Sequence, residues 1–353
     1  MGQRRVRYLC IIHPNRMKFN SLTYLAAVCV LIASCAKTSA DQSPFGRSLI
    51  GFTTVSTKAA SAYPTGSPFI TTSYQLASGK TWDANKAEAS LNINQEEVSY
   101  NATYNYWKTD TDYYWPTDGS TLTFFSYSPT TLKGSKTSVS TEGVRISSWD
   151  VTSDSGDILV ADIAQDKTKN ESLAGYTGVP TNFRQKLSKI VFRFRIADEA
   201  DAATQVKVSS ISLKDVYSAG LYSRGGYSDD KWTPSSTSLK SSRWSLYSGS
   251  FDIARGSFSA EQEFNMIPQR LLASASAHPI LEIGYSISTD GGANWESKTA
   301  SCYFDENLRQ EEWEKGKKYS YNIYIGVGQY PIDFDASVVE WTDCDGLKVP
   351  IGG

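Results

Sequence analysis

The stretch KIVFRFRIA, residues 189–197, indicates the fold class of this chain. Bulky apolar side chains and basic side chains occupy two sets of alternate positions: Ile190, Phe192, Phe194 and Ile196, against Lys189, Arg193 and Arg195. Because successive side chains of a β-strand point to opposite faces, this alternation predicts a strand with one buried and one solvated face. Such strands are typical of antiparallel β-sandwiches rather than of parallel sheets covered by helices.

Other windows alternate with the same period of two residues. They are residues 98–107, 280–288 and 319–327. A first strand is expected over residues 48–56, and Asp290-Gly291-Gly292 predicts a hairpin turn between two later strands. Helical spacing is nearly absent, and the clearest helical candidate is ENLRQEEWEKG, residues 306–316.

The length and composition favour two domains of the all-β class. A signal peptide over residues 1–34 and a tether over 35–47 leave about 300 residues, a length typical of two domains. We expect two antiparallel β-sandwich domains in series, over residues 48–180 and 181–353. The seam between them is expected within residues 174–185, where Gly and Pro interrupt the strand pattern.

An apolar run near the N-terminus predicts export. Residues 24–33 are too few to cross a bilayer, which takes about 20 apolar residues, but they follow Lys18 as the core of a secretory signal does. The segment Ile32-Ala33-Ser34-Cys35 also resembles the bacterial lipobox, whose cysteine is acylated, with palmitate as one attached chain, and becomes the first residue. We therefore expect lipidation at Cys35, and the alternative is an ordinary signal peptide with an incidental cysteine.

The charge of the exported part argues against nucleic acid as a partner. The first 34 residues contain five of the 35 Lys and Arg and none of the 37 Asp and Glu, so the remainder has a formal charge of −7. No cluster of basic residues offers a surface for phosphates. Four of those five basic residues precede Met17, which is the alternative start of the signal peptide.

Two cysteines remain in the part that is predicted to fold. Cys10 and Cys29 fall in the signal peptide, and Cys35 is the candidate lipid site, which leaves Cys302 and Cys344. An oxidising compartment permits a disulfide between these two. Two isolated thiols are the alternative, because sequence does not supply the geometry of a disulfide.

No motif in the exported part indicates catalysis, a metal or a cofactor. Its single histidine, His278, precedes Pro279 and is expected to be a turn residue rather than part of a Ser-His-Asp triad. One His and two dispersed Cys are too few for a zinc site. We therefore expect no enzyme activity, no cofactor and no metal site, with glycoside hydrolysis by a carboxylate pair as the distant alternative.

Several segments, taken in order, resemble the fimbrillin-like proteins of Gram-negative anaerobes, which form the type V pilin superfamily. Beyond the lipobox they are YYWPTDGSTLTFFSYSP (113–129), GDILVAD (156–162), FRQKLSKIVFRF (183–194), MIPQ (266–269), WEKGKKYSYNIYIG (313–326) and IDFDASVVEW (332–341). Each segment alone is weak evidence for the family. The resemblance rests on the order in which the segments occur along most of the exported chain. It implies two β-sandwich domains and export as a lipoprotein to the outer membrane, the cell surface or a fimbrium.

The resemblance also implies a way of assembling. In polymerising members, a surface protease cuts after an Arg or Lys, the first strand is lost, and a strand of a neighbouring subunit fills the groove. Arg47 and Lys58 are the candidate cleavage positions here, with ordinary solvated charges as the alternative. A cut after Lys58 would remove the strand over residues 48–56, whereas a cut after Arg47 would leave it attached. The candidate donor is the C-terminal run of residues 330–351, and its alternative is the last strand of the second domain.

Together these patterns predict a non-enzymatic fimbrial subunit or adhesin. Its expected partners are other fimbrial subunits, as donors or acceptors of a strand, an unidentified surface ligand, and the membrane through lipid on Cys35. A short C-terminal tail and a bridge from Cys344 favour an anchor subunit, a tip subunit or a free-standing surface lipoprotein over a stalk subunit. The alternative from another class is a glycan-binding surface lipoprotein, which requires an exposed patch of aromatic side chains.

Overall fold

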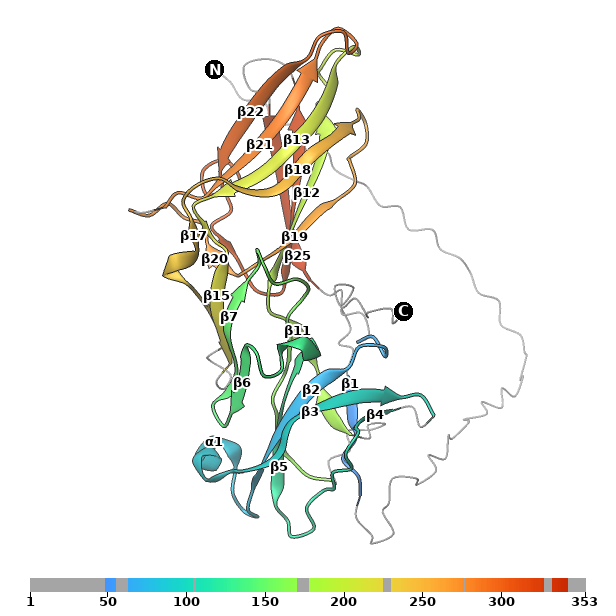
Figure 1. The fold of residues 1–353 in the computed structure, drawn as a ribbon, viewed down its shortest axis with the longest axis vertical. Helices are drawn as coiled ribbons and strands as arrows, with labels where there is room; N and C mark the ends of the chain where they lie inside the picture. Colours follow the sequence, from blue (N-terminus) through green and yellow to red (C-terminus); the bar gives the residue numbers. More distant parts are fainter. Residues whose placement is uncertain are drawn as a thin grey trace, which may run out of the picture. The chain divides into compact units, whose positions relative to one another are not determined.

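The structure, a computed structural model, describes residues 48–54, 63–103, 106–169, 178–224, 230–275, 277–326 and 332–341, with the backbone alone at Ile332 and Phe334. Strands dominate it (Figure 1), so the all-β class is confirmed. Its helical turns are short: α1 (Trp82–Asn85), η1 (Lys86–Glu88), η2 (Thr130–Leu132) and η3 (Ser236–Ser238). None of the helices in these ranges has the length and apolarity to cross a membrane.

The N-terminal part of the described chain builds a nine-stranded sheet. Its strands in spatial order are β10 (Val179–Thr181), β1 (Phe52–Thr54), β4 (Tyr106–Thr109), β3 (Ser90–Asn101), β2 (Phe69–Leu76), β5 (Thr121–Ser128), β8 (Leu159–Ala161) and β11 (Phe183–Gln185), with β9 (Ala164–Lys167) also paired to β5. Neighbouring residues of β2 and β5 enter different cores. Phe69 and Phe124 belong to one, and Ile70 and Phe125 to the other. The centre of this sheet is therefore covered on both faces.

A four-stranded sheet shares the second of these cores. Its strands are β16 (Lys231–Pro234), β15 (Ala219–Arg224), β7 (Gly143–Asp150) and β6 (Thr137–Ser140). Ile146 of β7 and Tyr222 of β15 pack in one cluster with Phe125 of the larger sheet. Because β7 and β15 come from opposite sides of the expected boundary between residues 180 and 181, this sheet joins both sides, and the boundary itself stays a prediction.

Two further four-stranded sheets form a sandwich. One contains β19 (Gln262–Met266), β12 (Ser188–Ile196), β24 (Lys317–Ile325) and β25 (Ile332–Glu340), and the other β18 (Trp244–Ile253), β13 (Gln205–Lys214), β21 (Ile280–Ser288) and β22 (Glu296–Tyr303). The strands of the second sheet lie side by side in Figure 1. Phe192 and Tyr321 from the first sheet and Leu281 from the second are buried in one core, as their alternation predicted, together with Ile211 of β13. Two short pairs complete the fold: β14 (Val216–Tyr217) with β17 (Leu239–Lys240), and β20 (Gln269–Arg270) with β23 (Glu312–Trp313).

Two ladders run parallel within these mostly antiparallel sheets. They are the pairs β12 with β24 and β1 with β10. Parallel neighbours need a long connection. The chain between β12 and β24 provides one, because it builds the opposite sheet of the sandwich.

The single strand predicted over residues 98–107 is wrong, because a hairpin interrupts it. β3 ends at Asn101, and β4 begins at Tyr106, which pairs with it. The Asn101 side chain accepts a hydrogen bond from the Thr103 amide at 3.1 Å, the local contact by which Asn favours turns. The other predicted hairpin is confirmed, and Gly291 and Gly292 take positive φ angles of 73° and 95° between β21 and β22.

The helix predicted over residues 306–316 is also wrong. Arg309 adopts a φ of 52°, which a helix does not allow, and Trp313 lies in β23. The Trp313 indole is buried and donates from Nε1 to the Tyr321 hydroxyl at 3.1 Å. Burial of this indole outweighs the helical propensity of its neighbours, which is a weak preference.

We expect Phe192→Ala to lower the free energy of unfolding by about 3–5 kcal/mol, the usual cost of removing a buried Phe side chain. Phe192 is 0% exposed and stacks on Tyr321 with ring centroids 5.5 Å apart. Urea unfolding followed by tryptophan fluorescence measures the change. The control is Leu91→Ala, where the side chain is 51% exposed and the expected change is within about 0.5 kcal/mol. Equal effects at the two positions would contradict the packing described.

Candidate functional site

The extended segment 48–54 lies between two strands of the nine-stranded sheet. In its β1 part, Phe52 pairs with Val179 of β10 in parallel and with Trp107 of β4 in antiparallel register. The Val179 amide donates to the Gly51 carbonyl at 2.8 Å. β1 is therefore an interior strand of the sheet, although it has only three residues.

Phe52 fills an apolar slot, which we call the first-strand seat, lined by Phe69, Trp107, Phe124 and Val179. Its side chain is 0% exposed, and its ring meets those of Phe69 and Phe124 edge to face, with centroids 5.9 and 5.7 Å away. Burying such a side chain contributes about 1.5–3 kcal/mol, and each aromatic pair adds about 0.5–1.5 kcal/mol. Within β1, Thr53 and Thr54 are only partly buried, so Phe52 supplies most of the strand's own side-chain contact. Ile50, just before β1, is buried in the same cluster.

Gly178 allows β10 to approach the segment closely. It has a φ of +140°, and a Cβ atom there would lie 2.9 Å from the Gly51 carbonyl oxygen. Any other residue would push β10 away from segment 48–54. The parallel pairing beside the first-strand seat thus depends on a glycine.

The residues predicted for processing lie outside the described residues. Arg47 directly precedes the segment 48–54 in the sequence, and Lys58 follows it. Cys35 lies further toward the N-terminus. Cleavage at either basic residue and lipidation at the cysteine stay predictions.

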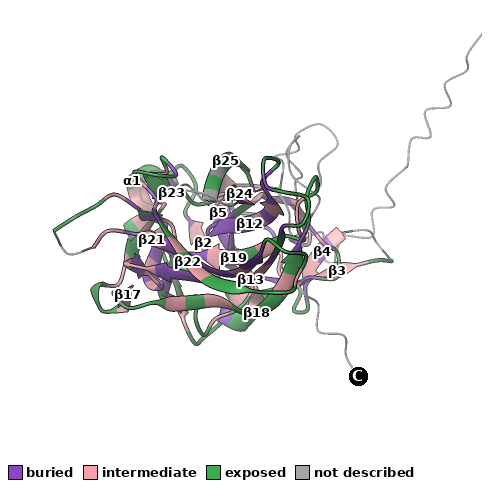
Figure 2. Cartoon of the chain, turned by 90° about the horizontal axis from the view of Figure 1, so that it is seen from above, coloured by how far each residue is buried: buried purple, intermediate pink, exposed green. Residues whose placement is uncertain are grey.

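β25 lies at the edge of its sheet among the described strands. Among the described strands it pairs only with β24, along all nine of its residues. Every side chain described on β25 is exposed, including Val338 at 48% and Val339 at 54% (Figure 2). Trp341 follows the strand and is 4% exposed, with Lys189 Nζ 4.7 Å from a ring centroid. An exposed edge of this kind can pair with a further strand.

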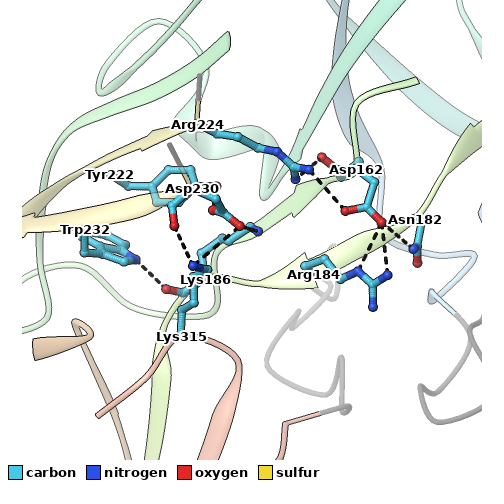
Figure 3. Close-up of polar contacts among 10 residues, drawn as sticks. Asp162, Asn182, Arg184, Lys186, Tyr222, Arg224, Asp230, Trp232 and Lys315 are labelled. Atoms are coloured by element: carbon cyan, nitrogen blue, oxygen red, sulfur yellow. Dashed lines mark hydrogen bonds and ion pairs between the residues drawn. The ribbon is translucent and has the colours of Figure 1, made fainter. Parts of the chain in front are cut away.

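A buried ion pair joins the connection before β12 to the start of β16 (Figure 3). Lys186 Nζ lies 3.0 Å from Asp230 Oδ2, and the Lys186 side chain is 2% exposed. Tyr222 donates its hydroxyl to Asp230 Oδ1 at 2.6 Å, and Lys315 Nζ donates to the Asp230 carbonyl at 2.6 Å. The Trp232 indole donates to the Lys186 carbonyl at 2.5 Å. The pair is thus surrounded by further hydrogen bonds, as a buried pair needs.

Arg224 extends this polar network toward β8. Its guanidinium donates to the Ala161 carbonyl at 2.7 Å and to Asp162 Oδ1 at 3.3 Å. Asp162 Oδ2 accepts from Asn182 at 2.6 Å and from Arg184 at 3.2 Å (Figure 3). Because the carboxylates here face cationic or amide donors, these contacts join β8, β15 and the start of β16 to the connection before β12.

Burial changes the titration of the central pair. It lowers the pKa of Lys186 to about 8, against the opposing attraction of Asp230. Burial also acts to raise the pKa of Asp230, but the charge of Lys186 and the hydrogen bond from Tyr222 outweigh it, so the net direction is down. The carboxylate therefore stays ionised at neutral pH.

Of the two cysteines predicted to pair, the structure describes one. Cys302 is 4% exposed, its thiol donates to the Leu281 carbonyl at 3.6 Å, and burial raises its pKa to about 12. Cys344 lies outside the described residues, so the disulfide stays a prediction.

The tryptophans mostly fill cores. Six of the nine are buried: Trp82, Trp107, Trp115, Trp149, Trp313 and Trp341. Trp232 and Trp244 are partly buried, and Trp295 is exposed at 38%, with Lys207 Nζ 4.6 Å from its ring centroid. The tryptophans therefore do not gather into an exposed patch of the kind that a glycan-binding surface requires.

Two residues of these sites have no clear sign of their role in the sequence. Val179 was placed in the seam between domains, yet it forms one wall of the first-strand seat. Lys186 shows no sign in the sequence of being buried, because its partner Asp230 is 44 residues away. Gly178, next to Val179, is the one feature of the sequence that points to the pairing of Val179 with β1, because a glycine before a short apolar strand can mark a close approach of two backbones.

Comparisons with known proteins agree with the fold. No curated protein matches the sequence. A family model described as fimbrillin-like matches residues 69–341. The fold is similar to that of a fimbrial protein from Bacteroides vulgatus, with a TM-score of 0.65 and 20% identity over 84% of this chain and 100% of that chain. It is also similar to that of a protein from Bacteroides uniformis assigned provisionally to cell adhesion, with a TM-score of 0.52 and 16% identity over 85% of this chain and 100% of that chain. At these identities the two structures show a shared fold.

Lys186→Met, which keeps the length of the side chain, tests the buried charge. The pKa of Lys186 is about 8 in the folded protein, below its ordinary value of 10.5, so between these values the unfolded chain binds more protons. The stability that this residue contributes therefore rises with pH above 8, by at most about 1.4 kcal/mol per pH unit. We expect the unfolding free energy of the wild type, measured relative to Lys186→Met, to increase from pH 7 to 9.5.

The control for this measurement is Lys133→Met, which changes an exposed lysine. Its unfolding free energy relative to the wild type is expected to be independent of pH over the same range. If the difference in unfolding free energy between the wild type and Lys186→Met stays constant with pH, the Lys186 amine is solvated rather than buried.

Proposed function

We infer the function of this chain from its family, because the chain belongs to the fimbrillin-like proteins. We propose that it is a non-enzymatic fimbrial subunit or adhesin of the cell surface. In this proposal it is exported as an outer-membrane lipoprotein through Cys35, and it assembles with other subunits by β-strand addition. The first-strand seat carries the proposal, since an interior strand of three residues is held there chiefly by Phe52.

Loss of segment 48–54 would open the seat to another strand. Phe69 and Phe124 would lose the ring that covers them, and among the described strands β10 would lose its only ladder partner. Exposed apolar side chains beside unpaired backbone groups are what an added strand satisfies. An extended donor with one large apolar side chain at the place of Phe52 would restore both contacts.

The position of β1 distinguishes between the two candidate cuts. β1 spans Phe52–Thr54, so a cut after Arg47 leaves it covalently attached, whereas a cut after Lys58 breaks its covalent link to the rest of the sheet and allows it to leave. We propose that Lys58 is the cut that opens the seat. Until then the segment covers an edge that would otherwise be prone to aggregation, which explains why a removable strand would be kept during export.

β25 is the candidate donor within this chain. Its backbone pairs with β24 along all nine residues, and the side chains that the structure describes on it are exposed. Trp341 opposes release, since it is buried directly after the strand and donates its amide to the Gly316 carbonyl at 2.7 Å. This anchorage favours a chain that accepts a strand more readily than it donates one. Such a chain suits an end of a fimbrium better than its stalk.

A peptide-binding experiment tests the seat. We expect a chain that begins at Ala59 to bind a fluorescent peptide with the sequence SLIGFTTVS, residues 48–56, as measured by anisotropy. A chain that begins at Ser48 is expected not to bind it, because its own β1 fills the seat. A peptide carrying Phe52→Ala should bind at least about 100-fold more weakly, since it lacks a side chain worth about 3 kcal/mol or more.

Circular dichroism identifies the outcome that contradicts the proposal. A chain from Ala59 that keeps the wild-type strand signal but does not bind the peptide would show that no open seat forms. Equal binding of the wild-type and Phe52→Ala peptides would show that the contact lies elsewhere. Competition by a peptide of residues 332–353 would support β25 as a donor.

A further inference from the structure

Three potential metal ligands meet at one end of the sandwich, beside the paired strands β21 and β22. His278 lies just before β21, and Asp305 and Glu306 lie in the turn after β22. Because Ile280 pairs with Tyr303, the start of β21 and the end of β22 are neighbours. The ladder thus brings together residues that are 27 positions apart in the sequence.

The three side chains converge on a small volume. His278 Nε2 lies 2.9 Å from Asp305 Oδ1 and 3.8 Å from Glu306 Oε1. One ligand atom from each residue lies within 4.8 Å of the other two. Ligand atoms about 2.0–2.2 Å from a tetrahedral zinc ion are themselves a little over 3 Å apart, so only small side-chain movements would be needed to bind one.

Two of the three side chains are already held in place. The His278 ring stacks on Tyr303 with centroids 3.8 Å apart and an angle of 21° between the planes. Asp305 accepts hydrogen bonds from the Ala273 amide at 2.9 Å and from the Glu306 amide at 3.0 Å. Fixed ligands lose little freedom when they bind an ion, and outer contacts of this kind orient ligands in metal sites. Glu306 is the exposed member, with 63% of its side chain accessible to solvent.

The charges of the cluster are not balanced by the protein. Two carboxylates face one imidazole, and a third carboxylate, Asp215, accepts from the His278 amide at 3.4 Å. Within the described residues, neither Asp305 nor Glu306 forms an ion pair with Lys or Arg. The cluster therefore keeps a net negative charge even when His278 is protonated. This is an observation independent of the distances, and it favours a bound cation.

We propose that His278, Asp305 and Glu306 form a surface site for one divalent transition-metal ion of the zinc type. The ion would be held by His278 Nε2 and by one oxygen from each carboxylate, with His278 neutral and its proton on Nδ1. An imidazole ligand favours zinc and related metals over calcium and magnesium, which prefer oxygen ligands alone. Three protein ligands leave a fourth position open to solvent. A bound ion would also tie the start of β21 to the turn after β22.

Isothermal titration with zinc sulfate tests the site. The exported chain from Cys35 onward is produced without a histidine tag and treated with a chelator. We expect it to bind one zinc ion, and we expect His278→Ala to weaken binding at least about tenfold. Glu306→Gln changes an exposed side chain, is not expected to affect folding, and should also weaken binding. The matched control is Glu296→Gln, an exposed carboxylate on β22 that leaves the site intact.

The histidine provides a second readout. His278 is the single histidine after residue 34, so its imidazole signals in a proton NMR spectrum report on this site alone. We expect one equivalent of zinc to shift or broaden these signals. Zinc binding that is equally strong in the wild type, His278→Ala and Glu306→Gln would overturn the proposal, since it would arise from scattered surface carboxylates. Imidazole signals unchanged by excess zinc would overturn it as well.

Discussion

The burial of Phe52 between Trp107 and Val179 is the contact on which the β10–β1–β4 edge of the nine-stranded sheet depends. It places an N-terminal segment inside the sheet and gives β10 its ladder partner. It also covers the Phe69 and Phe124 rings. Much of the order at this edge therefore rests on one side chain of a three-residue strand. A strand so short, with one dominant side-chain contact, is consistent with the strand exchange that we propose.

The two ends of the described chain are held by different forces. β1 is fixed chiefly by a buried aromatic side chain, whereas β25 is fixed by backbone hydrogen bonds and by Trp341 just beyond it. A seat that selects an apolar side chain can distinguish one strand from another, because ladder hydrogen bonds are the same for every sequence. The Lys186–Asp230 pair and its surrounding hydrogen bonds join the connection before β12 to β15 and β16. Lys315, which also contacts Asp230, is next to Gly316, the residue whose carbonyl accepts from the Trp341 amide.

Alternation in the sequence predicted the sandwich well, because strands such as β12 and β24 bury one face along their whole length. It could not show the turn after Asn101, since the same alternation continues on both sides of it. It placed Trp313 in a helix, because burial of one indole in a distant core has no local signal. For the candidate sites, the segment 48–54 was visible as an apolar run. Val179 was not, because its role depends on pairing with a residue far away in the chain.

The most direct test of strand exchange at the seat is the intact mass and N-terminal sequence of the protein taken from the cell surface. The proposal predicts a chain that begins at Ala59, with segment 48–54 lost and no lipid attached. A chain that begins at an acylated Cys35 and still contains Phe52 would contradict it. That result would leave an uncleaved anchor subunit or a free-standing surface lipoprotein whose first strand stays in its seat.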